Sequence, residues 1–455
     1  MLNASGATLI VAGPGSGKTR TLVYRVCRLL EGAGAAPENI LLLTFTNKAA
    51  REMKARVERL VGSRVQGIVA GTFHHFANIL LRNNHTLAGL PRNFTILDEE
   101  DANSIMKEIV TSEYEKVKKG VVESMRSAIS ISKLRMISIE EVLETPEYFH
   151  LRHQGEEIVK MADQYEKAKA AMGAVDFDDL LVKAYELLKN NPELRERYST
   201  RFTNILVDEF QDTDPLQGAI VRLLYRDGNN LLAVGDDSQS IYSFRGAEIR
   251  NMLEFKEKYG ARVFFLRTNY RSTHAIVSLV NACIKNSKQK IDKELVPIIE
   301  GGEKPTLVSA IDKESEALII GEQIAEQIKE GLKVGVLFRA AHFASELEIF
   351  LARTGIKYEM RGGIKFFEQR HIKDMIALLR VYENPKDRPA QIRLVRLFPK
   401  IGERAASIIV SRNNHEGMLG ELMKKNPDAA MLLGKIFGEK RNAAEIGRAS
   451  CRERV

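Results

Sequence analysis

The sequence predicts an α/β protein with a parallel sheet covered by helices on both faces and a helical domain inserted into it. Three observations lead to this fold class. Short apolar segments alternate with amphipathic helical patterns. A glycine-rich turn joins the first of these segments to the first helix. The alternation stops between about residues 86 and 189, where the pattern is mostly helical. Hydrophobic residues make up 44% of the chain and charged residues 28%, a balance that excludes wholesale disorder.

Each expected strand is a short aliphatic run followed by turn residues. The runs lie at 9–12, 40–43, 205–207, 231–234 and 263–266. The intervening helices have one apolar face, as at Leu22–Leu30 and Ala49–Val61. Such alternation gives right-handed crossovers and parallel strands. A second α/β pattern begins near Pro305, with a strand expected at 334–338 and a helix at 346–353.

The segment after the first expected strand has the composition of a phosphate-binding loop. Its residues are Ala12, Gly13, Pro14, Gly15, Ser16, Gly17, Lys18 and Thr19, with Ala12 where the general pattern has glycine. Glycines let backbone N–H groups converge on phosphate oxygens, and the helix N-terminus favours anions. We expect Lys18 to reach the β- and γ-phosphates and the Thr19 hydroxyl to bind Mg²⁺.

Two carboxylates, Asp208 and Glu209, directly follow the expected strand at 205–207. Ligands of parallel α/β sheets bind at the carboxyl ends of the strands. Asp208 is therefore expected to hold Mg²⁺, mostly through water. Glu209 is expected to orient and deprotonate an attacking water. This pair favours hydrolysis of a γ-phosphate, while transfer to a small acceptor by a P-loop kinase is the competing interpretation.

Seven segments resemble, in order, motifs of the superfamily 1 DNA helicases of the UvrD/Rep/PcrA type. They are 44–50, 71–74, 176–181, 208–211, 235–247, 269–272 and 362–368. The resemblance covers most of residues 1–444 and implies a P-loop NTPase with RecA-like motor domains. The implied domains are a first RecA-like ATP-binding motor at 1–85 and 190–275, a helical inserted domain at 86–189, the start of a second RecA-like motor at 276–385, and part of its helical insertion at 386–444.

The resemblance also implies roles at a site for ATP and Mg²⁺. Gln239 would hydrogen-bond the γ-phosphate and report its presence, and Tyr270 would stack on adenine. Arg271 would be an arginine finger, a group worth about 10³–10⁵ in rate. We therefore expect Lys18, Glu209, Gln239 and Arg271 to be catalytic.

Further matched residues are implied to bind single-stranded DNA. Phe45, Tyr242 and Phe244 would stack on bases, a contact that tolerates any sequence. Relatives usually carry Trp at the position of Phe244, and Phe45 has simple core packing as its alternative role. The other candidates are Thr46, Asn47, Thr72, His74 and Arg245.

Two features indicate a fragment of a longer protein. Relatives have an adenine-reading Gln before the loop and two further motifs, V and VI, which we do not find, so we expect this chain to be deficient in unwinding. Residues 445–455 resemble the translation of a common sequencing adapter, with a natural basic tail as the alternative. Genuine coding sequence is then expected to end near Ala444.

Together these features predict an ATP-dependent helicase or translocase acting on single-stranded DNA and duplex–single-strand junctions. By resemblance it moves 3′-to-5′ and serves repair or replication, with accessory proteins of those processes. The formal charge of +8 permits a nucleic-acid partner. Apolar runs too short to cross a membrane and three scattered cysteines favour the cytoplasm. The alternatives are a short, non-enzymatic DNA-binding or regulatory relative and a RecB/AddA-type helicase–nuclease subunit.

Overall fold

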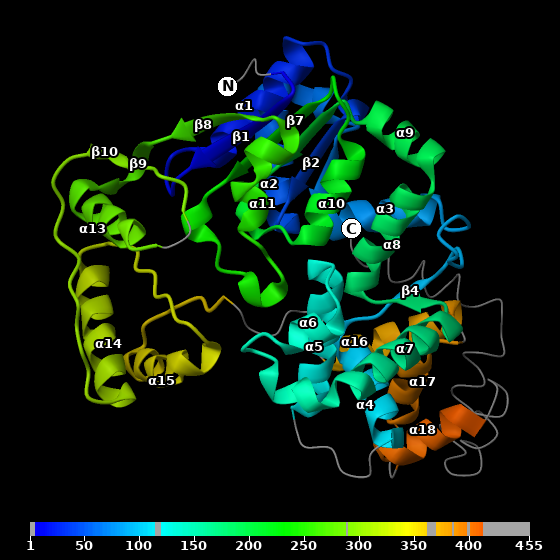
Figure 1. The fold of residues 1–455 in the computed structure, drawn as a ribbon. Helices are drawn as coiled ribbons and strands as arrows, with labels where there is room; N and C mark the ends of the chain where they lie inside the picture. Colours follow the sequence, from blue (N-terminus) through cyan, green and yellow to red (C-terminus); the bar gives the residue numbers. More distant parts are fainter. Residues whose placement is uncertain are drawn as a thin grey trace. The chain divides into compact units, whose positions relative to one another are not determined.

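The computed structural model describes residues 5–113, 120–287, 290–361, 370–384, 386–397 and 401–412 (Figure 1). It contains two compact units, one formed by Met1–Gly302 with Ala377–Val455 and the other by Glu303–Ile376. The matched segment 362–368 and the adapter-like residues 445–455 lie outside the described residues. Among the helices of the described ranges, none combines the length and apolarity that a membrane span requires.

The first unit is built on a six-stranded sheet in the order β3-β2-β6-β7-β1-β8, with every pair parallel. The strands are β1 Ala7–Ala12, β2 Ile40–Thr44, β3 Val69–Thr72, β6 Asn204–Val207, β7 Asn230–Gly235 and β8 Arg262–Leu266. Five of them lie at the aliphatic runs that predicted strands. The α/β fold class with a parallel sheet is therefore confirmed.

Helices pack on both faces of this sheet (Figure 1). On one face lie α1 Lys18–Glu31 and α2 Asn47–Val61, and on the other lie α3 Phe73–Asn83, α8 Phe177–Asn190 and α10 Pro215–Leu224. Strand β1 shows why its sequence is aliphatic throughout. Ile10 packs in the core that contains α1 and α2, whereas Leu9 and Val11 pack in the core on the opposite face of the sheet. A strand buried on both faces has no polar alternation.

Between β3 and β6 the chain is mainly helical and has its own core. Its elements are β4 Thr95–Ile96, α4 Glu99–Glu113, α5 Val121–Arg135, α6 Ile139–Leu143, α7 Gly155–Ala171, β5 Ala174–Val175 and, after α8, α9 Pro192–Arg201. The Lys169 ammonium of α7, 1% exposed, pairs with Asp176 at 2.8 Å and with Asp179. Because those carboxylates form the capping box that begins α8, this buried cluster joins the inserted helices to the sheet domain.

Apart from β8, the rest of the first unit lies after β7 in the sequence. Its elements are α11 Arg250–Leu253, α12 Phe255–Tyr259, β9 Thr268–Thr273, α13 His274–Lys285 and β10 Val296–Ile299, then α17 Arg388–Val395 and α18 Glu403–Arg412. Strand β10 pairs with β9 in parallel. Helix α16, Arg370–Glu383, places Arg380 in ion pairs with Asp101 of α4 and, at 2.9 Å, with Asp387.

The second unit has α14 Lys313–Lys329 packed on α15 Ser345–Thr354 through Ala317, Ile324, Leu347 and Leu351. Helix α15 matches the helix expected at 346–353. The strand expected at 334–338 is wrong, because these described residues form no ladder and Leu337 is 99% exposed. An apolar run becomes a strand only when a neighbouring strand accepts its backbone hydrogen bonds.

Candidate active site

The glycine-rich loop joins β1 to α1 and closes on itself. The Ser16 hydroxyl donates to the carbonyl oxygen of Gly13 at 2.6 Å. Gly15 and Gly17 have φ values of 70° and 92°, in the left-handed region that favours glycine. Gly17 is the N-cap of α1 and has no side chain, so no N-cap side chain accepts hydrogen bonds from the first backbone N–H groups of the helix. Such a terminus is a ready anion site.

The lysine of this loop meets the carboxylate that follows β6. Lys18 Nζ lies 2.9 Å from Glu209 Oε2, and Gln211 Nε2 donates to the same oxygen at 2.9 Å. Glu209 has a φ of 50°, which is rare for a residue with a side chain. Strain of this kind costs about 1–3 kcal/mol and is concentrated at functional sites. The structure thus brings together two residues predicted to be catalytic, across 191 residues of sequence.

Asp208 fits a bound cation. Its Oδ1 is buried and has no hydrogen-bond partner among the described residues. Burial raises the pKa of Asp208 to about 6, with Glu209 raising it further and Lys18 opposing. A buried oxygen without a partner, together with the half-buried Thr19 hydroxyl of the loop, is a donor set suited to Mg²⁺. Asp212, to which the sequence assigned no role, also has a partnerless buried oxygen and a pKa raised to about 6.

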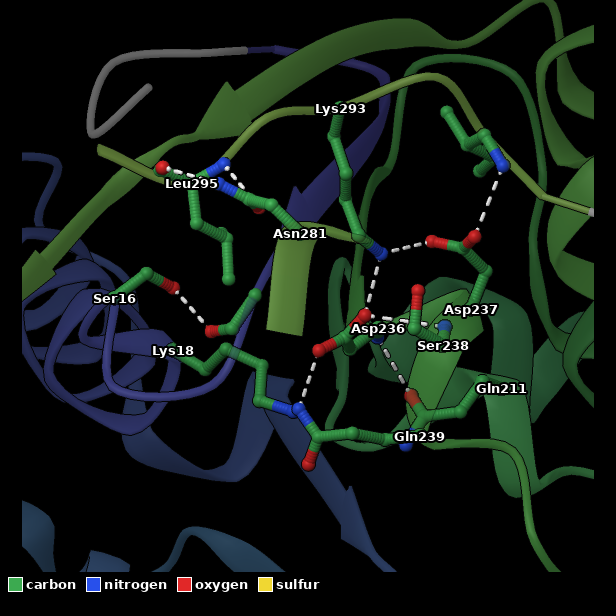
Figure 2. Close-up of polar contacts among 12 residues, drawn as sticks. Ser16, Lys18, Gln211, Asp236, Asp237, Ser238, Gln239, Asn281, Lys293 and Leu295 are labelled. Atoms are coloured by element: carbon green, nitrogen blue, oxygen red, sulfur yellow. Dashed lines mark hydrogen bonds and ion pairs between the residues drawn. The ribbon is translucent and has the colours of Figure 1, made fainter. Parts of the chain in front are cut away.

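The segment after β7 carries the predicted γ-phosphate reporter. Gln239 Nε2 donates to Asp236 Oδ2, and Asp236 Oδ1 accepts from the Ser238 backbone at 3.1 Å (Figure 2). The Asp236 N–H in turn donates to Gln211 Oε1 at 2.9 Å. Gln239 therefore connects through Asp236 and Gln211 to Glu209.

Strand β9 is pinned to the loop by Asn269, a buried residue within a matched segment to which the sequence assigned no role. Asn269 Nδ2 donates to the Pro14 carbonyl at 2.8 Å, while its Oδ1 accepts from the backbones of Arg271 and Ser272 at 2.9 and 2.8 Å. The Tyr270 N–H donates to the Gly15 carbonyl at 3.0 Å. The predicted adenine-stacking ring and arginine finger thus start directly beside the loop.

A row of aromatic rings lies at the carboxyl end of β2. The Phe45 and Tyr242 ring centroids are 4.6 Å apart, and those of Tyr242 and Phe244 are 6.0 Å apart. The Arg245 guanidinium carbon lies 5.6 Å from each of the last two centroids. Phe45 is 36% exposed and Phe244 is 60% exposed, so this row, Phe45–Tyr242–Phe244, is a surface feature and not core.

Both threonines predicted to contact DNA are N-caps of helices. The Thr46 hydroxyl accepts from the Ala49 N–H at 3.1 Å and caps α2, and Thr72 caps α3 through His75 at 3.2 Å. Thr44 pairs with Thr72 across β2 and β3, so both helix starts lie at one end of the sheet. Asn47, the first residue of α2, is exposed there.

His74 is half-buried, with its ring 5.9 Å from that of Phe177 in an edge-on contact. Desolvation lowers its pKa to about 4, so at neutral pH it is an uncharged hydrogen-bonding group. An uncharged His74 therefore adds no positive charge to the predicted contact with single-stranded DNA. In the described part of the chain, no three His, Cys, Asp or Glu side chains are grouped to hold a metal.

Comparison with known proteins decides the family. Residues 1–260 match the UvrD/REP helicase N-terminal domain and residues 264–432 match the UvrD-like helicase C-terminal domain. The chain belongs to the UvrD/REP helicase family. It is 37% identical over 407 residues to the ATP-dependent DNA helicase PcrA of Staphylococcus epidermidis, and 36% identical over 407 residues to that of Staphylococcus aureus. These matches cover 89% of this chain and 55% of each relative, so the chain spans about half their length.

In this UvrD/REP-type chain, sequence reasoning missed several residues that support the site, among them Gln211, Asn269 and Lys293. The first two lie inside matched segments, so membership of a motif was the available signal. Lys293 lies outside all seven segments. Its ammonium contacts Asp236 and Asp237, which precede it by 57 and 56 positions, and a local sequence pattern does not reveal so distant a contact.

Proposed function

We propose that this chain forms the ATP-binding and DNA-gripping part of an ATP-dependent helicase that translocates on single-stranded DNA. The observation that carries the proposal is the continuity of residues 235–247. One end of this segment holds Gln239 beside the nucleotide residues, and the other holds two rings of the Phe45–Tyr242–Phe244 row. One short stretch of backbone thereby links a γ-phosphate reporter to a base-stacking surface.

In the proposed reaction, Lys18 and the loop N–H groups bind the β- and γ-phosphates of ATP. Thr19 and Asp208 would hold Mg²⁺, which neutralises charge on the phosphate oxygens. Glu209 takes a proton from the attacking water, and Gln211 holds its carboxylate in place.

The remaining groups act on the transferred phosphate and the base. Gln239 donates to the γ-phosphate oxygens, while Arg271 stabilises the charge that develops on them. Tyr270, 62% exposed beside the loop, offers a face to adenine. The bases of the DNA strand stack on the Phe45–Tyr242–Phe244 row, with Arg245 near its phosphates.

The wider role follows from the family. We infer 3′-to-5′ movement, action at duplex–single-strand junctions and a role in DNA repair or replication in the cytoplasm, with accessory proteins of those processes as partners. These assignments rest on what relatives of this type do, and they concern the longer protein of which the relatives are examples.

The test is ATP hydrolysis by the chain with and without oligothymidylate. We expect turnover that rises with single-stranded DNA, and Lys18→Ala should abolish it. Glu209→Gln should lower kcat by about 10²–10⁴-fold with nucleotide binding retained, because the loop is intact and only the base is lost. Turnover that ignores DNA would contradict the proposal, and DNA binding without any turnover would favour a binding or regulatory protein.

A further inference from the structure

We propose that Lys293 is a positioning residue that sets the γ-phosphate reporter. The inference rests on the proposed ATP site and names a residue outside every matched segment. Its side chain is 2% exposed, and its ammonium forms ion pairs with Asp236 Oδ1 and Asp237 Oδ1, whose side chains are fully buried (Figure 2). Lys293 thus places one positive charge between two buried negative ones.

The two aspartates need this cation. Adjacent carboxylates repel each other, and removal from water penalises the charged form of both. Burying a charge costs free energy unless the charge is paired and hydrogen-bonded. Lys293 supplies the pairing, while the backbone N–H groups of Ser238 and Ile291 donate to Asp236 at 3.1 Å and to Asp237 at 2.9 Å.

Lys293 reaches the reaction centre through Asp236. The other oxygen of Asp236 accepts from the Gln239 amide, so the lysine is one residue removed from the γ-phosphate reporter. A second path runs from the Asp236 N–H to Gln211 Oε1 at 2.9 Å, and from Gln211 Nε2 to Glu209 Oε2 at 2.9 Å. Lys293 contacts neither the loop nor Glu209 in these interactions, so its effect passes through other residues.

The segment that carries Lys293 also contacts the phosphate loop. The buried Leu295 side chain fills the space over Gly13, where an added Cβ would lie 2.2 Å from Leu295 Cδ2. Asn281 of α13 fixes Leu295 from both sides, accepting from its N–H at 3.1 Å and donating to its carbonyl at 2.9 Å. The chain then enters β10, the parallel partner of the strand that carries Arg271. Residues 291–295 therefore span from the reporter to the loop.

This arrangement has a direct consequence for nucleotide discrimination. To bind a γ-phosphate, Gln239 must redirect its amide from Asp236 to the phosphate. With Lys293 present, Asp236 keeps a positive partner when the amide leaves. Without it, Asp236 retains the amide as its donor and leaves a negative charge beside the γ-phosphate. Loss of Lys293 should thus weaken ATP binding and leave ADP binding nearly unchanged.

The experiment compares Mg²⁺-dependent affinities for ADP and for a non-hydrolysable ATP analogue in the full chain. We expect Lys293→Met to reduce the preference for the ATP analogue by about tenfold, the size of a typical coupling between two sites. Lys293→Arg, which keeps the charge, should restore much of that preference. Lys290→Met is the matched control, because the Lys290 ammonium donates to the Lys285 carbonyl at 2.8 Å and, among the described residues, forms no ion pair with Asp236 or Asp237.

Two further variants keep the inference testable. If Lys293→Met does not fold, Lys293→Met with Asp237→Asn preserves the net charge and should still lose the preference. In a Gln239→Ala background, Lys293→Met should have no additional effect on the ratio of affinities. Equal losses for both nucleotides, or an unchanged ratio in a folded variant, would overturn the inference. Nucleotide binding that survives Lys18→Ala would instead overturn the proposed ATP site.

Discussion

Replacement of Phe244 by alanine tests the proposed base-stacking surface most directly. The ring is 60% exposed and lies at the end of the Phe45–Tyr242–Phe244 row, so its removal leaves no cavity in the core. The other two rings remain 4.6 Å apart, and the row is shortened by one. Base–aromatic stacking contributes about 1–3 kcal/mol per base. At 1.4 kcal/mol for each factor of ten, we expect the dissociation constant for single-stranded DNA to rise about 5- to 150-fold.

The assay is fluorescence anisotropy with a labelled oligothymidylate of about 15 nucleotides, near the upper site size of a small single-strand-binding surface. Salt is held constant because phosphate contacts depend steeply on it. Phe149→Ala is the matched control: this ring is 53% exposed and also lies near an arginine, with the Arg152 guanidinium carbon 5.5 Å from its centroid. Phe244→Trp should tighten binding through its larger face. Equal affinities for the wild type, Phe244→Ala and Phe149→Ala would refute the stacking surface.

Two further predictions concern the loop and a buried carboxylate. Gly15→Ala should weaken ATP binding at least about tenfold in a direct titration, because the new Cβ would lie 2.7 Å from Arg271 Cβ. Gly34→Ala is the control, since Gly34 also has a positive φ but an added Cβ there meets no atom within 4 Å. Equal effects of the two substitutions would contradict the steric reason. Asp214→Asn should gain stability relative to the wild type as pH rises from about 4 to 7. Burial raises the Asp214 pKa from 3.8 to about 7, so the wild type loses up to about 4 kcal/mol over that window as the carboxylate ionises. In the wild type the Gln217 N–H donates to Asp214 Oδ1 at 2.7 Å, and the asparagine side chain keeps an oxygen that can accept this hydrogen bond. If the free energies of chemical unfolding of the two proteins followed parallel pH profiles, this account would be contradicted.

Strand prediction succeeded where burial on both sheet faces makes a run aliphatic throughout. Strand β3 escaped detection because Val69–Thr72 is a short edge strand, half-buried at three of four positions and containing a glycine. The run at 334–338 is largely apolar too, yet it pairs with no strand in the described residues. Apolar character thus identified buried strands, whereas pairing depends on neighbours that a local pattern does not encode.

The candidate site divides in the same way. Lys18, Asp208 and Glu209 were predictable because each follows a strand, and parallel strands bring their carboxyl ends to one edge. The supporting contacts were not, since Asn269 meets Pro14 across 255 residues and Lys293 meets Asp236 across 57. A lysine in a polar stretch predicts solvent exposure. Only the tertiary fold places it among buried carboxylates.

The contacts of residues 235–247 connect the proposed γ-phosphate reporter to the Phe45–Tyr242–Phe244 row. Asp236 is fixed by Lys293, and the Ser240 hydroxyl donates to the Gln211 carbonyl at 3.1 Å. On the far side, Arg135 of α5 donates to the Ser243 carbonyl at 3.3 Å. Ser240 lies one residue after Gln239 and two before Tyr242, so we expect a backbone shift that follows a new partner for Gln239 to be passed to this ring. If bases stack on these rings as proposed, the grip on DNA should change with the nucleotide bound.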